Sequence, residues 1–132
     1  MVTIPENVIA LLKDPAATKI LSTVCAGNRP HSIVAGTIAP LGDSQMMIGE
    51  VLMKKSAANL AKNPNAAFTV VKGMEAYEIH CTFKEQVKNG PVFDAVKAMC
   101  DKLKLPLFSL YVFDVVSVYN ESANHENGKK IA

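Results

Sequence analysis

The sequence has 132 residues, an apolar content of 49% and a net charge of +2 from 14 basic and 12 acidic side chains. These values predict one globular domain over residues 1–132 with a packed core, and they exclude an intrinsically disordered chain. The charge is nearly balanced, and Arg29 is the single arginine. Nucleic-acid and membrane-surface partners are therefore not expected, because both need a concentrated positive field.

The cysteines and the N-terminus indicate a cytoplasmic protein. Cys25, Cys81 and Cys100 form an odd set without CxxC spacing, which favours reduced thiols packed as small apolar side chains. The first residues lack a basic segment followed by a long apolar run, so no signal peptide is expected. No apolar run approaches the roughly 18 residues of a membrane span.

The first half of the chain predicts a short helix and then strands. The helix covers residues 5–13, where Pro5 suits a first helical turn and Asp14-Pro15 ends the pattern. Gly27-Asn28 tolerates positive φ and predicts a hairpin turn. The strands of this half are expected over residues 18–26, 30–39 and 45–49.

The second half predicts two more helices. The short one covers residues 56–62, and the longer one opens at Gly90-Pro91 with an apolar stripe expected to pack on the sheet. Residues 120–132 are polar, so we expect a flexible tail. The strands are expected over residues 66–72, 76–87 and 107–119, the second with clear apolar–polar alternation.

The order of these elements indicates the fold class. Hairpins dominate and no series of βαβ units occurs, so the pattern favours a mainly β (α+β) protein. We expect an antiparallel barrel with peripheral helices rather than a doubly wound sheet.

The segment Met53-Lys54-Lys55-Ser56 is the most informative candidate site. It follows a strand and precedes a helix, where free backbone amides, lysine charge and a hydroxyl could together hold a phosphate. The same residues also fit a solvated lysine pair followed by an ordinary serine N-cap. Spacing alone does not choose between these two interpretations.

Other chemistry receives little support. There is no GxGxxG or P-loop motif, and His31, His80 and His125 are scattered, so no metal site is expected. No residue can be named as a catalytic acid, base or nucleophile. The aromatic residues of the last strand fit either a packed core or interface, or stacking on a planar cofactor.

Three segments resemble the FMN-binding split-barrel family, which includes pyridoxamine 5′-phosphate oxidase. The hairpin Ala26–Ser32 is similar to the family's turn between its first two strands. Met53–Leu60 resembles its basic-hydroxyl segment ahead of a short helix with an internal Asn. Asn63–Phe68 is similar to its helix-to-strand step. The resemblance covers residues 5–119 and implies a six-stranded antiparallel Greek-key split β-barrel.

The resemblance also implies a cofactor, its site and a homodimer with flavin at the subunit interface. The cofactor is FMN, with its ring along the second strand and its phosphate at the basic-hydroxyl segment. Small residues would let the ring approach closely. The single arginine departs from the longer oxidases and makes pyridoxal-type substrates unexpected. The implied cofactor-binding residues are Val34, Ala35, Gly36, Thr37, Gly49, Lys54, Lys55, Ser56 and Asn59.

The implied activity is that of an FMN-dependent oxidoreductase or electron carrier. Flavin supplies the redox chemistry itself, so the absence of a nameable acid or base is compatible with it. The redox partner, small molecule or protein, stays open. The alternative is a non-catalytic module that stores or senses flavin, or that binds haem through a histidine such as His80 or His125. Deazaflavin is also compatible with the fold.

Overall fold

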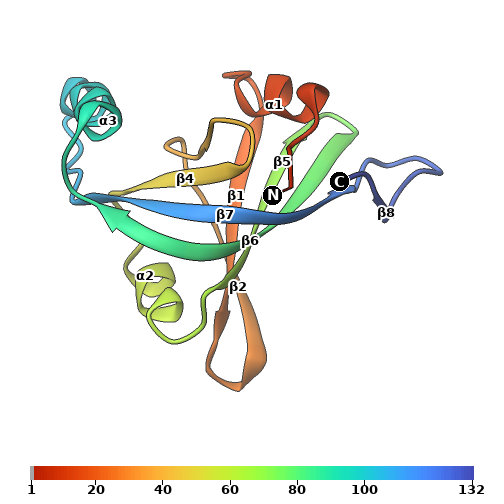
Figure 1. Cartoon of the computed structure of the whole chain (residues 1–132), viewed down its shortest axis with the longest axis horizontal. Helices are drawn as coiled ribbons and strands as arrows, with labels where there is room; N and C mark the ends of the chain where they lie inside the picture. Colours follow the sequence, from red (N-terminus) through yellow and green to blue (C-terminus); the bar gives the residue numbers. More distant parts are fainter. Residues whose placement is uncertain (1) are drawn as a thin grey trace.

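The computed structural model describes residues 2–132 (Figure 1). Its three α-helices are α1 (Glu6–Leu12), α2 (Lys54–Leu60) and α3 (Pro91–Lys102), with a short 3-10 turn, η1, at Ala26–Asn28. Its strands are β1 (Thr18–Cys25), β2 (Arg29–Val34), β3 (Ala39–Leu41), β4 (Gln45–Glu50), β5 (Asn65–Lys72), β6 (Glu75–Val87), β7 (Ser109–Asn120) and β8 (Lys129–Lys130).

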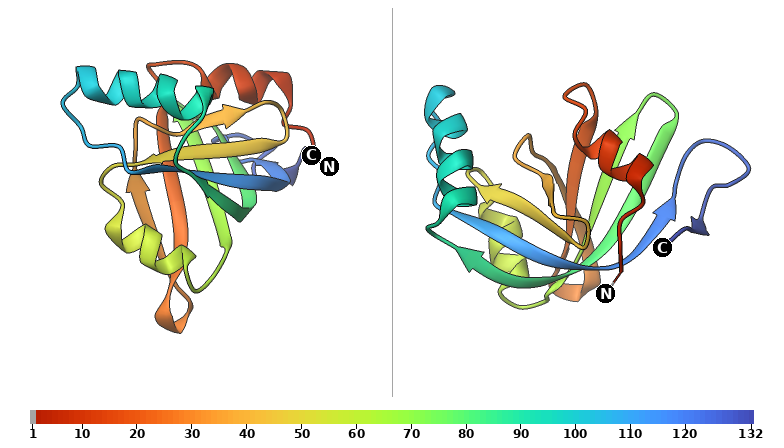
Figure 2. Two further views of the ribbon diagram at one scale, coloured as in Figure 1. Left: turned by 60° about the vertical axis from the view of Figure 1, so that its left-hand side comes forward. Right: turned by 45° about the horizontal axis from the view of Figure 1, so that its top comes forward.

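The strands form one antiparallel sheet in the order β2-β1-β5-β6-β7-β4-β3, with β8 paired to β7. The sheet curls strongly, and the helices lie around its margins (Figure 2). The six predicted strands correspond to β1, β2, β4, β5, β6 and β7. The predicted antiparallel split barrel is therefore confirmed, with two short strands, β3 and β8, added.

The core lies inside the curled sheet. Apolar side chains of β6 alternate with polar ones, so Tyr77, Ile79 and Cys81 are buried while their neighbours are partly exposed. Phe68 of β5 packs edge-on against Phe113 of β7, with 5.0 Å between ring centroids. This contact places aromatic residues of the last strand in the core, which was one of their two expected roles.

The hairpin turn between β1 and β2 is confirmed. Gly27 has φ +74° and Asn28 has φ +60°, the left-handed conformation that glycine and asparagine adopt most readily. The predicted strand over residues 30–39 is confirmed up to Val34, and its extension to residue 39 is wrong, because β2 ends at Val34 and β3 starts at Ala39. The strands β2 and β3 lie at opposite ends of the sheet, so the chain must leave one edge to reach the other.

The apolar stripe of α3 is only partly covered, which differs from the expectation that all of it packs on the sheet. Val96 and Cys100 are buried against Leu110 of β7. The helix stands at one end of the barrel (Figure 1). The exposed members are Val92, Met99 and Leu103.

The expected flexible tail over residues 120–132 is instead folded back onto the barrel. Strand β8 pairs with the end of β7, the Ile131 amide donates to the Val118 carbonyl at 2.8 Å, and the Val118 amide donates to the Ala132 carbonyl at 2.9 Å. Ser122 is buried and its hydroxyl bonds to the backbone of Ala76. The polar composition of the segment suggested mobility. Its backbone groups instead find hydrogen-bond partners on β7 and at Ala76, which hold it in place.

No helix within residues 2–132 is long and apolar enough to cross a membrane.

Candidate functional site

Residues 35–38 connect the two edges of the sheet at one end of the barrel. The backbone amide of Ala35 donates to the carbonyl of Lys19 on β1, at 3.2 Å. The Thr37 hydroxyl donates to the carbonyl of Gly49 on β4, at 3.1 Å. The segment expected to lie along a flavin ring is therefore a bridge that is hydrogen-bonded to β1 and to β4, the strands next to the two edges of the sheet, and Val34 is its only residue within a strand.

The two glycines expected at the cofactor differ in their surroundings. A Cβ placed on Gly36 would meet no heavy atom within 4 Å, so a flat ligand can approach its backbone. A Cβ placed on Gly49 would lie 3.0 Å from Leu107 Cδ1 and 3.1 Å from Thr37 Cβ. The space beside Gly49 is filled by the protein itself, which gives this glycine a packing role.

A small pocket gathers five of the expected residues, Val34, Ala35, Gly36, Thr37 and Gly49. Its volume is about 170 Å³, and its other lining residues include Ile48 and the loop 51–53. Ligand pockets usually enclose about 300–1,000 Å³, so this pocket can hold part of a cofactor but not all of it. Its rim is apolar and open, since Val34 is 72% exposed. We call it the ring pocket.

The basic-hydroxyl segment lies next to the ring pocket through Met53, which lines that pocket and precedes α2. The predicted start of the helix at Ser56 is wrong: α2 starts at Lys54, so Ser56 is inside its first turn and is not the N-cap. Lys54 and Lys55 are exposed. Among residues 2–132 neither lysine forms an ion pair.

Ser56 is fully buried, and its Oγ has no hydrogen-bond partner within residues 2–132. The helix has only seven residues, so the positive charge at this place comes mainly from the two lysine ammonium groups. A buried hydroxyl without a partner is unfavourable, so Ser56 needs a hydrogen-bond partner, and a ligand phosphate beside the two unpaired lysines would supply one.

Asn59 has a structural role that the sequence did not indicate. Its side-chain amide donates to Thr23 Oγ1 at 3.0 Å and to Cys25 Sγ at 3.3 Å, which fastens α2 to β1. Thr23 is buried, so its hydroxyl depends on this bond. Both donors of the Asn59 amide are thus used by the protein, and only its carbonyl oxygen is left for a ligand.

A second pocket lies on the other side of the loop 51–53, and sequence reasoning missed it. Its volume is about 570 Å³, and its lining includes Glu50, Lys54 and Phe108. The Ser109 hydroxyl donates to Glu50 Oε1 at 2.7 Å and accepts from Gln86 Nε2 at 3.1 Å. These partners are far apart in sequence, so no local pattern could have indicated them.

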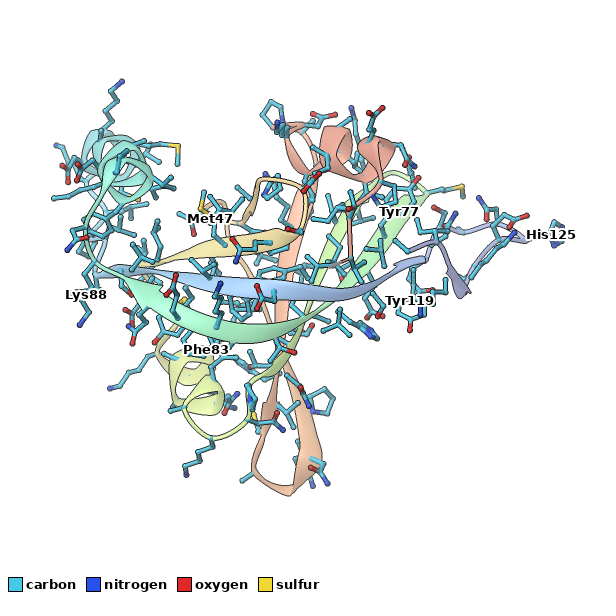
Figure 3. All side chains as sticks on the ribbon, in the orientation of Figure 1. Met47, Tyr77, Phe83, Lys88, Tyr119 and His125 are labelled. Atoms are coloured by element: carbon cyan, nitrogen blue, oxygen red, sulfur yellow. The ribbon has the colours of Figure 1, made fainter. Side chains whose placement is uncertain are left out.

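The histidines do not gather at either pocket. His80 lies on β6 with its Nε2 2.7 Å from Glu78 Oε1, and His125 lies at the tip of the loop between β7 and β8 (Figure 3). His31 has a buried Nε2 without a partner. Within residues 2–132 no three His, Cys, Asp or Glu side chains are placed to hold a metal ion.

The residues whose pKa values are shifted lie outside the ring pocket, and Cys81 and Tyr111 among them belong to the core. Burial, and then the negative charge of Asp114, raises the pKa of the Cys81 thiol. Burial, and then the charge of Glu50, raises the pKa of Tyr111. Both groups are therefore neutral near pH 7, and neither is poised for acid–base chemistry.

No family model matches the sequence, and the search of curated proteins found no significant match. Solved structures do match. An FMN-binding protein from Syntrophomonas wolfei aligns with a TM-score of 0.81 at 20% identity, over 91% of this chain and 87% of that one. HupZ from group A Streptococcus aligns with a TM-score of 0.78 at 15% identity, over 98% and 99% of the two chains.

HutZ, the haem storage protein from Vibrio cholerae, aligns with a TM-score of 0.62 at 13% identity, over 92% of this chain and 97% of that one. At these identities the comparison concerns the fold and leaves the ligand open. The chain has the split-barrel fold of the FMN-binding and pyridoxamine 5′-phosphate oxidase-like proteins, as the resemblance in its sequence predicted.

Proposed function

We propose that this protein binds FMN and acts as a flavin-dependent oxidoreductase or electron carrier. The observation that carries the proposal is the ring pocket, which is lined by the open backbone at Gly36 and by Met53, the residue directly before the unpaired Lys54 and Lys55. The first feature suits a flat ring and the second suits a phosphate. The likeness in fold to an FMN-binding protein points the same way.

Each part of the site has a distinct binding task. The backbone of Val34 to Thr37 lies beside the ring, and its bonds to β1 and β4 keep it in one position. Lys55 holds the phosphate, since charge-assisted bonds contribute about 1.5–3 kcal/mol each. Ser56 adds a hydrogen bond if its hydroxyl turns outward from its buried position. Bound flavin itself accepts and releases the electrons.

A second copy of the chain completes the proposed site. The ring pocket is small, and two large apolar side chains that line it are exposed, Val34 by 72% and Leu52 by 82%. Apolar patches of this kind are commonly covered by self-association. We therefore propose a homodimer with the flavin at its interface, and a dimeric mass in sedimentation equilibrium at micromolar concentration is the expected result.

The redox proposal is tested by adding reduced nicotinamides, and then a low-potential one-electron donor, to the flavin-loaded protein without oxygen. Bleaching of the flavin absorbance supports a redox role. If none of these donors bleaches it, the protein stores or senses flavin instead. The free cysteines fit the reducing cytoplasm that we propose as its location.

The binding proposal is tested by titrating the flavin-free protein with FMN. Lys55→Ala should weaken binding about tenfold or more. Lys62→Ala, an exposed lysine two residues beyond the end of α2, is the matched control and should bind like the wild type. Equal affinities of the Lys55 variant and the wild type, or no FMN binding at all, would contradict the assignment.

The absorbance spectrum of the protein as isolated separates the alternatives. Flavin gives two bands in the near ultraviolet and blue, whereas haem gives one intense Soret band. Neither the ring pocket nor the second pocket contains a histidine, whereas His80 lines a separate pocket of about 450 Å³ over β1, β5 and β6. A Soret band in the isolated protein would therefore replace the FMN proposal with a haem-binding one.

A further inference from the structure

Three polar side chains form a directed chain that the proposed FMN site does not use. Gln86 of β6 donates to the hydroxyl of Ser109 on β7, and that hydroxyl donates to the carboxylate of Glu50 on β4. Ser109 is fully buried. Because its oxygen accepts from an amide, its proton points to Glu50, and the chain ends on a carboxylate fixed as an acceptor.

This carboxylate lines the second pocket, which we call the Glu50 pocket. Its volume of about 570 Å³ lies within the usual range of ligand pockets, and its walls include Leu52, Ala57 and Phe108. The backbone amide of Phe108 donates to the Glu50 carbonyl at 2.9 Å, so the backbones that carry the aromatic ring and the carboxylate are held side by side.

We propose that the Glu50 pocket binds a flat organic cation that carries N–H donors, such as an amidinium or a protonated aromatic amine. Ser109 occupies one carboxylate oxygen, and no donor within residues 2–132 is hydrogen-bonded to the other. Two parallel N–H groups suit a carboxylate, and the face of Phe108 attracts a planar cation.

Lys54 also lines this pocket and has the opposite charge, so it favours an anion. Its side chain is exposed and forms no ion pair within residues 2–132. A long, solvated lysine loses rotamer entropy when it is ordered on a ligand, whereas the Glu50 carboxylate is already held in place. The negative charge of the Glu50 carboxylate, which is held in place, therefore favours a positively charged ligand.

The binding of such a cation needs no flavin. The Glu50 pocket shares Val51, Leu52 and Met53 with the ring pocket, and it is also lined by Lys54, one of the two lysines of the proposed phosphate site. An FMN titration of the same sample reports on the proposed function separately. If the protein binds FMN but no cation, only the proposed cation site is refuted. If it binds the cation but not FMN, only the FMN proposal is refuted.

The experiment is an NMR titration of the flavin-free, ¹⁵N-labelled full chain with benzamidine and with benzoate, which share one shape and differ in charge. We expect benzamidine to shift the amides of Leu52, Lys54, Ala57 and Phe108, and benzoate to bind more weakly. Glu50→Gln keeps an acceptor for Ser109 and should weaken benzamidine binding about tenfold. Ser109→Ala frees the carboxylate and should weaken binding to a smaller extent.

Glu121→Gln removes another half-buried carboxylate, directly after the other end of β7, and is the matched control. Its spectrum and its benzamidine affinity should equal those of the wild type, and dispersed spectra establish that each variant is folded. The inference is overturned if benzoate binds the pocket as tightly as benzamidine. It is also overturned if Glu50→Gln leaves the affinity unchanged, or if millimolar benzamidine shifts no amide around the pocket.

Discussion

Removing the Asn59 side chain tests whether this residue supports the fold or only a cofactor. In Asn59→Ala, α2 loses its bonds to Thr23 and Cys25, and the Thr23 hydroxyl, 2% exposed, loses its partner. A lost hydrogen bond costs about 1 kcal/mol and an unpaired buried hydroxyl about 1–3 kcal/mol. The better helix propensity of alanine returns about 0.5 kcal/mol.

The expected net loss in the free energy of unfolding is therefore about 2 kcal/mol, a decrease of roughly 8 °C in Tm for a domain of this size. Urea unfolding of the flavin-free protein, followed by circular dichroism, measures it. Asn89→Ala removes an exposed asparagine that forms no side-chain hydrogen bond within residues 2–132, so its midpoint should equal that of the wild type.

A double-mutant cycle with Thr23→Val isolates the bond itself. Valine has nearly the shape of threonine, so the double variant leaves no unpaired group and should lose less than the sum of the single losses, by about 1 kcal/mol. Strictly additive losses would refute the pairing. An Asn59→Ala variant as stable as the wild type but unable to bind FMN would show that the residue serves the cofactor alone.

Three further predictions concern packing, thiols and pH. Gly49→Ala should lower the free energy of unfolding by about 1–3 kcal/mol, because the side chains of Leu107 and Thr37 must move, whereas Gly36→Ala should leave it unchanged. Equal melting temperatures of the two variants would contradict this prediction. In labelling with a thiol reagent at pH 8, the half-exposed Cys25 should react well before Cys81, because burial raises the pKa of the Cys81 thiol. Labelling of both thiols at the same rate would contradict the burial of Cys81. The hydrogen bond from Lys72 lowers the pKa of Asp14 in the folded protein. The ionised carboxylate therefore stabilises the fold at any pH above its unfolded pKa, and this stabilisation is lost as the pH falls through the pKa of the folded state. Asp14→Asn should therefore have a lower urea midpoint than the wild type at pH 7 and converge with it near pH 2.

Local signals explain what the sequence predicted well. The alternation along β6 reflects one buried face of a sheet, and positive φ at Gly27 and Asn28 reflects a tight hairpin. Both depend on residues close in the chain. Five residues of the expected site, from Val34 to Thr37 and Gly49, do share one pocket, because the bridge is tied to β4.

Long-range contacts explain what the sequence did not predict. The break after Val34 follows from the sheet order, which separates β2 from β3. The ordered C-terminal segment depends on Val118, a residue of the preceding strand. The bond between Ser109 and Glu50 joins two strands that are 59 residues apart in sequence, and a fixed carboxylate of this kind has no local signature.

The comparison of FMN with riboflavin tests the central claim most directly. Both contain the same ring, and only FMN contains the phosphate that the claim assigns to Lys55. Fluorescence titration should give the wild type at least about tenfold tighter binding of FMN than of riboflavin, and Lys55→Ala should remove most of this difference. Equal affinities of the wild type for the two flavins, or a difference that survives in Lys55→Ala, would contradict the claim.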